Sequence, residues 1–436
     1  MNKNVWCMGL VSLALFSSCS SSAFVVKESR VIPEDFAGMV HAGNTRTDEE
    51  YALLNNMGVS WILATFYWGS IEPQQGVWNF SNYDSYVDRA KQDGKKIIAV
   101  LAYDTPWMYS EEDKKKPNPH IRPKDIPKYL NFVEATVLRY RDKVDVWSVW
   151  NEPNIARFWK GSKQDFIVLT KAAIQKIREL APEATILAGA FSGLPTIPFV
   201  SESYVGYVKA LFESGAMEQA NGIAFHPYST NPQGTAALYD SLVKLVTPYG
   251  FQDNIWITEV GYPTHGLYPS RVSEEKQPAY VIQTMCTLAA RGARVICWYE
   301  MFDKYNQEDK RTADSEHYFG LLYPNYEPKQ GAAAYGLVSR YIGGMTYQPQ
   351  SLSRDGVPSS IVTYYFEGEN NRATLIIWKN SGKQTLRLSL PGTGHVLHDA
   401  VTGAAHTLEP QTTLAIGTMP SIITWTMNGD SPSISN

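Results

Sequence analysis

Cysteine is scarce in this chain of 436 residues, which contains 4, and histidine is little commoner with 8. Cys286 and Cys297 lie among apolar residues, on a predicted helix and the predicted strand after it, so we expect buried free thiols rather than a disulfide. No cysteine and histidine spacing resembles a zinc site. We therefore expect neither a metal nor a cofactor.

A large excess of one charge is also lacking, because 39 lysines and arginines stand against 43 aspartates and glutamates, a formal net charge of -4. A nucleic-acid partner needs a concentrated basic surface, so we expect none. Aromatic residues, in contrast, are plentiful, with 12 Trp, 26 Tyr and 16 Phe. They suit a large core or platforms that stack against flat ligand faces, of which sugar rings are one kind.

The apolar run "VWCMGLVSLALF" is too short to cross a bilayer, and with Lys3 before it the run is typical of an export signal over residues 1–23. Two processing sites are open: "LFSSC", a lipoprotein box that would lipidate Cys19, and "SSA", which ends at Ala23. The sequence therefore predicts an exported protein that is periplasmic, outer-membrane-anchored or extracellular. We expect a monomer, with a lipid anchor to a bacterial membrane if Cys19 is modified.

Strand-like apolar runs alternate with amphipathic stretches of helical length over residues 34–345. The predicted strands are 36–43, 60–68, 95–104, 144–152, 184–193, 222–229, 254–263 and 293–303. The predicted helices are 46–57, 82–93, 125–141, 165–181, 202–214, 234–247, 275–291 and 329–342. Eight strand–helix units predict an α/β fold, the (β/α)8 TIM barrel. A doubly wound open sheet is the alternative, but no glycine-rich phosphate loop follows the first strand.

The pattern changes near residue 346, where short alternating segments such as "TLRLSL" are separated by turn residues. A period of two with close turns predicts a small antiparallel β-sandwich over 346–426. It shows no aromatic strip of its own, so we expect it to pack against the barrel. Residues 23–29 are a candidate extra strand, and 427–436 are predicted to form a disordered tail.

Two glutamates end predicted strands of the barrel: Glu152 on the fourth strand and Glu259 on the seventh. The functional residues of a TIM barrel collect at these strand ends. Alternation along the seventh strand groups Glu259 with Ile255 and Ile257 and predicts that all three point inward. Paired carboxylates that face each other across a cleft are what acid–base cleavage of a glycosidic bond requires. The alternative for each glutamate alone is a salt bridge within the barrel.

An ordered set of motifs resembles the clan A retaining glycoside hydrolases, also called the 4/7 superfamily. "WNEPN" (150–154) and "WITEVGYP" (256–263) carry the two glutamates, and "WGSIEPQQGVWNF" (68–80) and "FGLLYPNYEPKQGAAAYGL" (319–337) resemble the segments after strands 2 and 8. "GIAFHPYS" (222–229) and the C-terminal sandwich favour family 39, which includes β-xylosidases and endoglycosidases that act on biofilm polysaccharide.

The resemblance implies a role for each matching residue. Glu152 would be the general acid/base, Glu259 the nucleophile, and Asn151 a ligand of the sugar 2-hydroxyl. Tyr228 would donate a hydrogen bond to Glu259. The remaining candidates line the cleft, and each has a packing or loop role as its alternative: His226, Trp298 as the floor on which the sugar stacks, Trp68, Asp104 and Trp107. The sequence departs from the clan at Leu63, where an arginine beneath the nucleophile is usual.

The implied function is a retaining β-glycoside hydrolase that cleaves within an extracellular or cell-surface polysaccharide. Two other functions stay open: a carbohydrate-binding homologue with little or no activity, and a transglycosylase that remodels surface glycans with the same glutamates. A metal-dependent hydrolase lacks the histidine and aspartate clusters that it would need at the strand ends.

Overall fold

The computed structural model describes residues 26–109, 111, 121, 123–195, 201–305 and 313–436. The predicted export signal, with Cys19 and Ala23, lies outside these ranges. Within them, no helix has both the length and the apolar character needed to cross a membrane.

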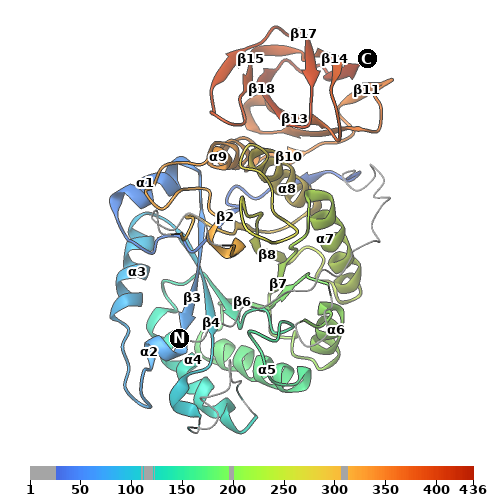
Figure 1. Ribbon diagram of the computed structural model, residues 1–436. Helices are drawn as coiled ribbons and strands as arrows, with labels where there is room; N and C mark the ends of the chain where they lie inside the picture. The colour runs from blue at the N-terminus through green and yellow to red at the C-terminus, as the bar shows by residue number, and fades with distance from the viewer. Residues whose placement is uncertain (1–25, 110, 112–120, 122, 196–200, 306–312) are drawn as a thin grey trace.

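Eight parallel strands close into a barrel in the order β2 to β9, which confirms the predicted fold (Figure 1). Each strand coincides with one of the eight predicted segments. Their bounds are Ala37–Val40 (β2), Trp61–Tyr67 (β3), Lys96–Ala102 (β4), Val146–Val149 (β5), Thr185–Ser192 (β6), Gly222–His226 (β7), Ile255–Val260 (β8) and Ile296–Trp298 (β9).

Helices surround the barrel, and the eight that were predicted are all present (Figure 1). They are Asp48–Asn56 (α1), Ser81–Gln92 (α3), Ile126–Tyr140 (α4), Lys163–Leu180 (α5), Tyr204–Glu213 (α6), Pro232–Val246 (α7), Gln277–Arg291 (α8) and Gln330–Ile342 (α9). The short helix α2 (Trp68–Ile71) was not predicted, because it begins immediately after β3 without a turn signal.

Helix α5 illustrates how the sequence produces these elements. Ser162 accepts a hydrogen bond from the backbone N–H of Asp165, whose carboxylate accepts one from the N–H of Ser162, so a capping box starts the helix. Phe166, Ala173 and Ile177 recur at helical spacing and are buried against the strands.

Two apolar layers alternate along the strands. Ile62 and Ile97 lie in the large cluster between strands and helices, whereas their neighbours Leu63 and Ile98 belong to a second cluster that fills the barrel interior. This period of two decides which side chains reach the mouth of the barrel. Cys286 and Cys297 are free and buried, as predicted.

The C-terminal part is a β-sandwich of two sheets. One sheet has the order β1-β10-β12-β13-β18-β15-β16 and the other β11-β19-β14-β17. The bounds are Arg30–Val31 (β1), Thr346–Tyr347 (β10), Ser353–Asp355 (β11), Ile361–Glu367 (β12), Arg372–Lys379 (β13), Gln384–Ser389 (β14), Gly392–His398 (β15), Ala405–Thr407 (β16), Gln411–Ile416 (β17), Ser421–Met427 (β18) and Ser433–Ser435 (β19).

Both ends of the described chain join this sandwich. Strand β1 follows the segment 23–29 in which an extra strand was expected, and it pairs with β10. The disordered tail predicted over 427–436 is wrong, because β19 pairs with β14 and β11 within it. Ile434 is buried in the sandwich core, and this contact orders a segment whose polar composition suggested disorder.

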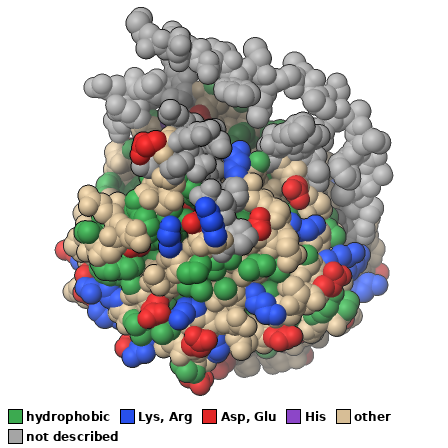
Figure 2. Space-filling model, turned by 90° about the horizontal axis from the view of Figure 1, so that it is seen from below, with side chains coloured by type: hydrophobic (Ala, Val, Ile, Leu, Met, Phe, Trp, Pro, Cys, Tyr) green, Lys and Arg blue, Asp and Glu red, His purple; other side chains and the backbone are tan. Residues whose placement is uncertain are grey.

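The sandwich packs on the barrel next to α8 and α9 (Figure 1). Tyr364 and Trp378 of the larger sheet belong to the same buried cluster as Val281 and Met285 of α8. Gln283 of α8 also donates to the carbonyl of Thr418. The expected packing of the sandwich against the barrel is therefore confirmed. On the side turned away from the sandwich, the described basic and acidic side chains are interspersed (Figure 2).

Candidate active site

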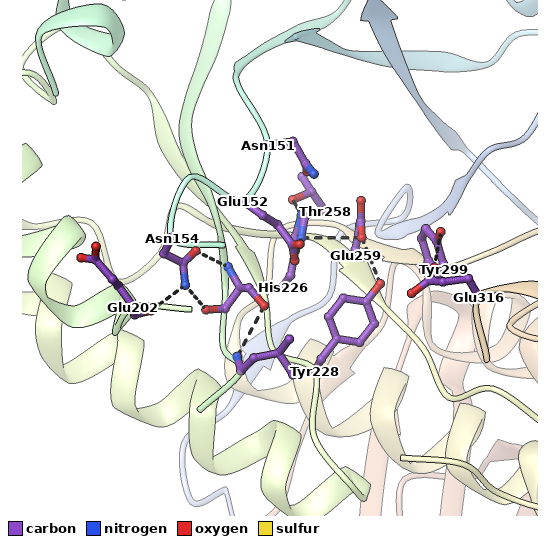
Figure 3. Close-up of polar contacts among 12 residues, drawn as sticks. Asn151, Glu152, Asn154, Glu202, His226, Tyr228, Thr258, Glu259, Tyr299 and Glu316 are labelled. Carbon is purple, nitrogen blue, oxygen red and sulfur yellow. Dashed lines mark hydrogen bonds and ion pairs between the residues drawn. The ribbon is translucent and has the colours of Figure 1, made fainter. Parts of the chain in front are cut away.

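Glu152 and Glu259 meet at the mouth of the barrel (Figure 3). Glu152 follows β5 and Glu259 lies in β8, which are the fourth and seventh strands of the barrel. A carboxylate oxygen of each lies within 4.8 Å of the other, and the two side chains are 11% and 16% exposed. The fold thus brings together two carboxylates that lie far apart in the sequence.

His226, the last residue of β7, lies between the two glutamates. Its Nδ1 is 2.9 Å from Oε1 of Glu152 and 3.6 Å from Oε2 of Glu259. Its Nε2 is 2.9 Å from Oγ1 of Thr258, a residue that the sequence analysis did not single out. Burial alone lowers the pKa of His226, but the charges of Glu259 and Glu152 outweigh it and leave that pKa raised. An imidazolium at this position offsets part of the negative charge of the pair.

Glu259 has a hydrogen-bond donor and histidines around it. The Tyr228 hydroxyl donates to Oε2 of Glu259 at 2.9 Å, which is the predicted contact. Burial raises the pKa of Glu259, whereas the charges of His226 and His41 and the Tyr228 hydrogen bond act in the opposite direction. Leu63 is buried in the barrel interior. Among the charges that act on Glu259, those of His226 and His41 lower its pKa.

Arg294 cannot supply the missing charge. Its guanidinium pairs with Asp35 at 2.9 Å, before the first barrel strand and therefore at the opposite end of the barrel from the glutamates.

The prediction that Ile255 and Ile257 point inward together with Glu259 was wrong. Ile255 and Ile257 lie in the outer cluster, whereas Trp256 between them lies in the interior cluster. The pairing of β8 with β9 shifts its register between Ile257 and Val260, and this irregularity lets Glu259 reach the mouth nevertheless. A strict period of two would have turned its side chain outward.

Trp298 does not form the floor of a cleft. Its side chain is fully buried in the outer cluster, next to Tyr262, so the predicted sugar platform is contradicted. Cys297 belongs to the interior cluster, and Tyr299 packs against that cluster. The side chain that points inward is therefore that of Tyr299, the residue after Trp298.

Tyr299 is the aromatic side chain that reaches the mouth from the end of β9. Its ring lies edge-on to His41 at 5.3 Å and to Tyr228 at 6.3 Å, between centroids. Its hydroxyl donates to Glu316 at 3.1 Å (Figure 3). The alternation of "VICWY" contained the signal for this residue, because Val295, Cys297 and Tyr299 share one face.

Asn151 also lies at the mouth, and its Nδ2 donates to the Tyr103 hydroxyl at 2.9 Å. Asn154 fixes the loop that carries Glu152: its side chain donates to the carbonyls of Ser192 and Glu202 and accepts from the N–H of Ser192. These contacts anchor the glutamate loop to β6, so the position of Glu152 is set by a strand other than its own.

Trp68, Trp107 and Asp104, which were predicted to line the cleft, make contacts away from the two glutamates. Trp68 is fully buried, stacks on Phe132 and donates to Glu72, so it belongs to the packing of α2 and α4. Trp107 donates to the carbonyl of Glu72 at 2.7 Å and is partly buried. Asp104 accepts from the Tyr109 hydroxyl at 3.1 Å, and burial raises its pKa to about 6. None of the hydrogen bonds described for these three reaches Glu152 or Glu259.

The sequence suggested no cluster of metal ligands at the strand ends, but the fold creates a set that could hold a cation. Glu152, His226 and Glu259 offer ligand atoms within 4.8 Å of one another. Both ring nitrogens of His226 already lie at hydrogen-bond distance from other side chains, at 2.9 Å from Glu152 and from Thr258. A metal would have to displace the contact with Glu152, so the arrangement fits a hydrogen-bonded acid–base pair better.

Comparisons with known proteins agree with the observed fold. A family model described as β-galactosidase, glycoside hydrolase family 42, matches residues 40–115. The structure resembles a family 39 glycoside hydrolase from Bacteroides cellulosilyticus WH2 (TM-score 0.74, 19% identity, 91% of this chain and 81% of that one). It also resembles a monomeric β-xylosidase from Caulobacter crescentus CB15 (TM-score 0.64, 13% identity, 92% and 97% of the chains).

A third similar structure is a family 30 subfamily 8 xylanase from Clostridium acetobutylicum (TM-score 0.58, 12% identity, 91% and 96% of the chains). These matches cover both the barrel and the sandwich. At such identities the resemblance concerns the fold: this chain has the barrel-plus-sandwich architecture of family 39 glycoside hydrolases.

Proposed function

We propose that this protein is a retaining β-glycoside hydrolase, with Glu152 as general acid/base and Glu259 as nucleophile. The observation that carries the proposal is the carboxylate pair, whose oxygens lie within 4.8 Å at the ends of the fourth and seventh barrel strands. Retaining enzymes hold their carboxyl groups about 5–5.5 Å apart, and inverting ones about 6.5–9.5 Å. The spacing therefore supports retention.

Each glutamate keeps one oxygen for the reaction. Tyr228 donates to Oε2 of Glu259, and Oε1 is left to attack the anomeric carbon while the bond to the leaving oxygen breaks. His226 contacts Oε1 of Glu152, and Oε2 is left to give its proton to that leaving oxygen. Water then attacks the glycosyl–Glu259 ester, Glu152 takes the proton of the water, and both carboxyl groups return to their starting states.

His226 and Tyr228 would position and stabilise this pair. Burial works against an ionised Glu259, and the His226 imidazolium at 3.6 Å works in its favour. Asn151 would bind the sugar 2-hydroxyl, a contact that can strengthen toward the transition state. Tyr299 would replace Trp298 as the aromatic platform, because it reaches the mouth.

Two glutamine variants test the roles assigned to Glu152 and Glu259, by comparing substrates whose leaving groups do and do not need a proton. Glu152→Gln should reduce kcat/KM for a natural glycan about 1,000-fold, and much less for an aryl glycoside whose leaving group needs no proton, because kcat/KM reports only the step that cleaves the glycosidic bond. Glu259→Gln should reduce turnover of both substrates by at least as much, because it removes the nucleophile. Steady-state rates on a β-linked oligosaccharide and on its nitrophenyl glycoside give the comparison.

Glu202→Gln is the matched control, because only the backbone carbonyl of Glu202 contacts the Asn154 side chain and its own side chain is exposed. The control should retain wild-type rates. Normal activity of either catalytic variant would refute the assignment, and activity abolished by a chelator would favour a metal at the same three residues. Products of unchanged anomeric configuration are expected by nuclear magnetic resonance.

We further propose cleavage within a polysaccharide chain, on the resemblance to family 39. Internal cleavage should release fragments of mixed length early in the reaction, whereas end-trimming should release a single small sugar. Transfer of the glycosyl group to an added sugar instead of water would identify the transglycosylase alternative. Binding without any product from a broad glycan panel would identify a carbohydrate-binding homologue.

A further inference from the structure

A hollow of about 380 Å³ opens at the ends of β2 and β3, beside the candidate active site. Residues from the β2–α1 loop, β3, α2, α3 and the segment after β9 line it. One lining residue, His41, lies edge-on to the ring of Tyr299 at 5.3 Å between centroids, so the hollow adjoins the mouth of the barrel. Its size lies within the range of about 300–1,000 Å³ that small-molecule sites occupy.

The charged side chains that line this hollow are all basic. Arg46 and Lys304 carry full positive charges, and His41 is the third nitrogen base. No aspartate or glutamate is among the lining residues that the structure describes. Of these bases, Lys304 and His41 both contact the carboxylate of Glu300, whereas the described contacts of the Arg46 side chain include no carboxylate.

Arg46 is held in place by a dedicated loop. Its backbone has the left-handed conformation (φ 59°), which a residue with a side chain adopts only at a cost of about 1–2 kcal/mol. The buried carboxylate of Glu50 accepts hydrogen bonds from the N–H groups of Gly43, Asn44, Thr45 and Arg46 and so imposes this shape. The loop therefore presents a fixed guanidinium to the hollow.

The positive charge of the Arg46 guanidinium is not paired with a described carboxylate. Its Nη2 donates to the carbonyl and side-chain oxygens of Asn82, which are neutral acceptors. Among the described side chains, no ion pair joins Arg46 to a carboxylate, and its Nε has no hydrogen-bond partner. Nε is buried, but a guanidinium that no described carboxylate neutralises, at the wall of a hollow, is suited to an incoming anion.

Lys304 forms the second basic edge of the hollow. Its ammonium is 2.6 Å from Glu300, a buried carboxylate that also lies 2.6 Å from Nδ1 of His41. The Lys304 side chain is 42% exposed, and its ammonium lies 5.3 Å above the ring centroid of Tyr299. Glu300 thus positions both bases and offsets part of their positive charge, so Arg46 is the main cation of the hollow.

An aromatic ring completes the site. Tyr67, at the end of β3, lines the hollow and is 43% exposed. An exposed tyrosine face offers a stacking surface for a sugar ring. Stacking and cations in one hollow suit a sugar that carries a negative group.

We propose that this hollow is a sugar-binding subsite for an anionic residue, a uronate or a sulfated sugar, next to the bond that is cleaved. The inference rests on the proposed function and narrows its substrate class to acidic polysaccharides. Arg46 binds the carboxylate or sulfate, Lys304 adds a second positive charge, and Tyr67 stacks on the ring.

Matched pairs of oligosaccharides test the proposal. One pair contains β-linked glucuronic acid and its carboxyl-reduced counterpart, and the other a sulfated sugar and its desulfated counterpart. Wild-type protein should prefer the acidic member of at least one pair by about 10- to 100-fold in kcat/KM, as expected for a charge-assisted hydrogen bond. The pair that shows the preference distinguishes carboxylate from sulfate.

Arg46→Gln should reduce this preference about tenfold, mainly through KM, and Lys304→Gln should reduce it less. Arg387→Gln on β14 of the sandwich is the control, because it removes an exposed arginine far from the barrel mouth. Circular dichroism checks that the variants fold. Equal rates on the acidic and neutral members, or an unchanged preference in Arg46→Gln, would overturn the inference and leave the proposed function intact.

If no glycan is cleaved, a binding measurement distinguishes failure of the proposed hydrolase function from failure of the proposed anionic subsite. Calorimetric titration of Glu259→Gln protein with the glucuronate oligosaccharide should then show binding that weakens in the double variant with Arg46→Gln. Binding without cleavage by the wild type would refute the hydrolase and support the anionic subsite. The same titration is made with the sulfated oligosaccharide, and absence of binding of both would refute the subsite as well.

Discussion

His226 illustrates at the residue scale how one side chain can take over the task of another. The resemblance to the clan implies an arginine near the position of Leu63, and this leucine is buried among apolar residues. His226 instead contacts both carboxylates from the end of β7. Unlike an arginine, a histidine can lose its charge near neutral pH, so the protection of an ionised Glu259 should depend on pH.

His226→Asn tests this role, because asparagine keeps a neutral donor near the position of Nδ1 and loses the charge. The His226 charge lowers the pKa of Glu259, so its removal should raise that pKa further. A nucleophile must be ionised, and the acidic limb of the kcat/KM profile should therefore move to higher pH by about one unit. An acidic limb at the wild-type pH would refute the electrostatic role.

The control for this experiment is His406→Asn, an exposed histidine on β16 of the sandwich. It should leave the pH profile of activity unchanged. A loss of turnover in His226→Asn without any shift of the profile would indicate that His226 only fills space.

At the scale of elements, the β2–α1 loop shows how a helix start can organise a binding site. Thr47 caps α1 by accepting from the N–H of Glu50, and the Glu50 side chain turns back to bind the N–H groups of the loop. The loop carries His41 at one end and Arg46 at the other, both with positive φ. One buried carboxylate thus fixes the backbone that carries Arg46.

Glu50→Gln should destabilise the protein by about 2–4 kcal/mol, because it replaces charge-assisted hydrogen bonds with weaker ones and brings an amide NH2 near backbone donors. Glu49→Gln, an exposed neighbour in the first turn of the same helix, should change the free energy of unfolding by about 0.5 kcal/mol or less. Urea titration followed by tryptophan fluorescence measures both variants. Equal stability of the two would contradict this account of the loop.

At the scale of the whole molecule, the barrel and the sandwich share one buried cluster. Tyr364 and Trp378 stack on each other and lie in the same apolar set as α8, and Thr374 of β13 donates to the carbonyl of Tyr341 of α9. A continuous core of this kind couples the stability of both parts. The sandwich therefore supports the outer wall of the barrel rather than acting as a separate module.

Trp378→Ala should reveal this coupling. Loss of a fully buried tryptophan should cost about 3–5 kcal/mol, and the chain should still unfold in one transition at a lower temperature. Scanning calorimetry and the loss of glycosidase activity should give the same midpoint. Two separate transitions, with activity lost only in one of them, would contradict the shared core. Thr407→Ala on the exposed edge strand β16 serves as the control.

Local patterns predicted most of the elements, because strand and helix periodicities depend on residues that are neighbours in the sequence. They failed where a tertiary contact decides the outcome. The polar tail 427–436 is ordered because β19 finds a partner in β14, and Trp68 is buried because α2 turns it toward Phe132. Neither partner is near in sequence.

The sequence by itself determined the eight strand–helix units, the sandwich and the two glutamates at strand ends. Only the tertiary structure decided which side chains share the mouth of the barrel. The register shift in β8 brings Glu259 inward, the parity of β9 selects Tyr299 over Trp298, and the closure of the barrel places His226 between the carboxylates. Side chains alternate between the two faces of a strand with every residue. A one-residue irregularity therefore changes which side chains reach the site, although the fold stays the same.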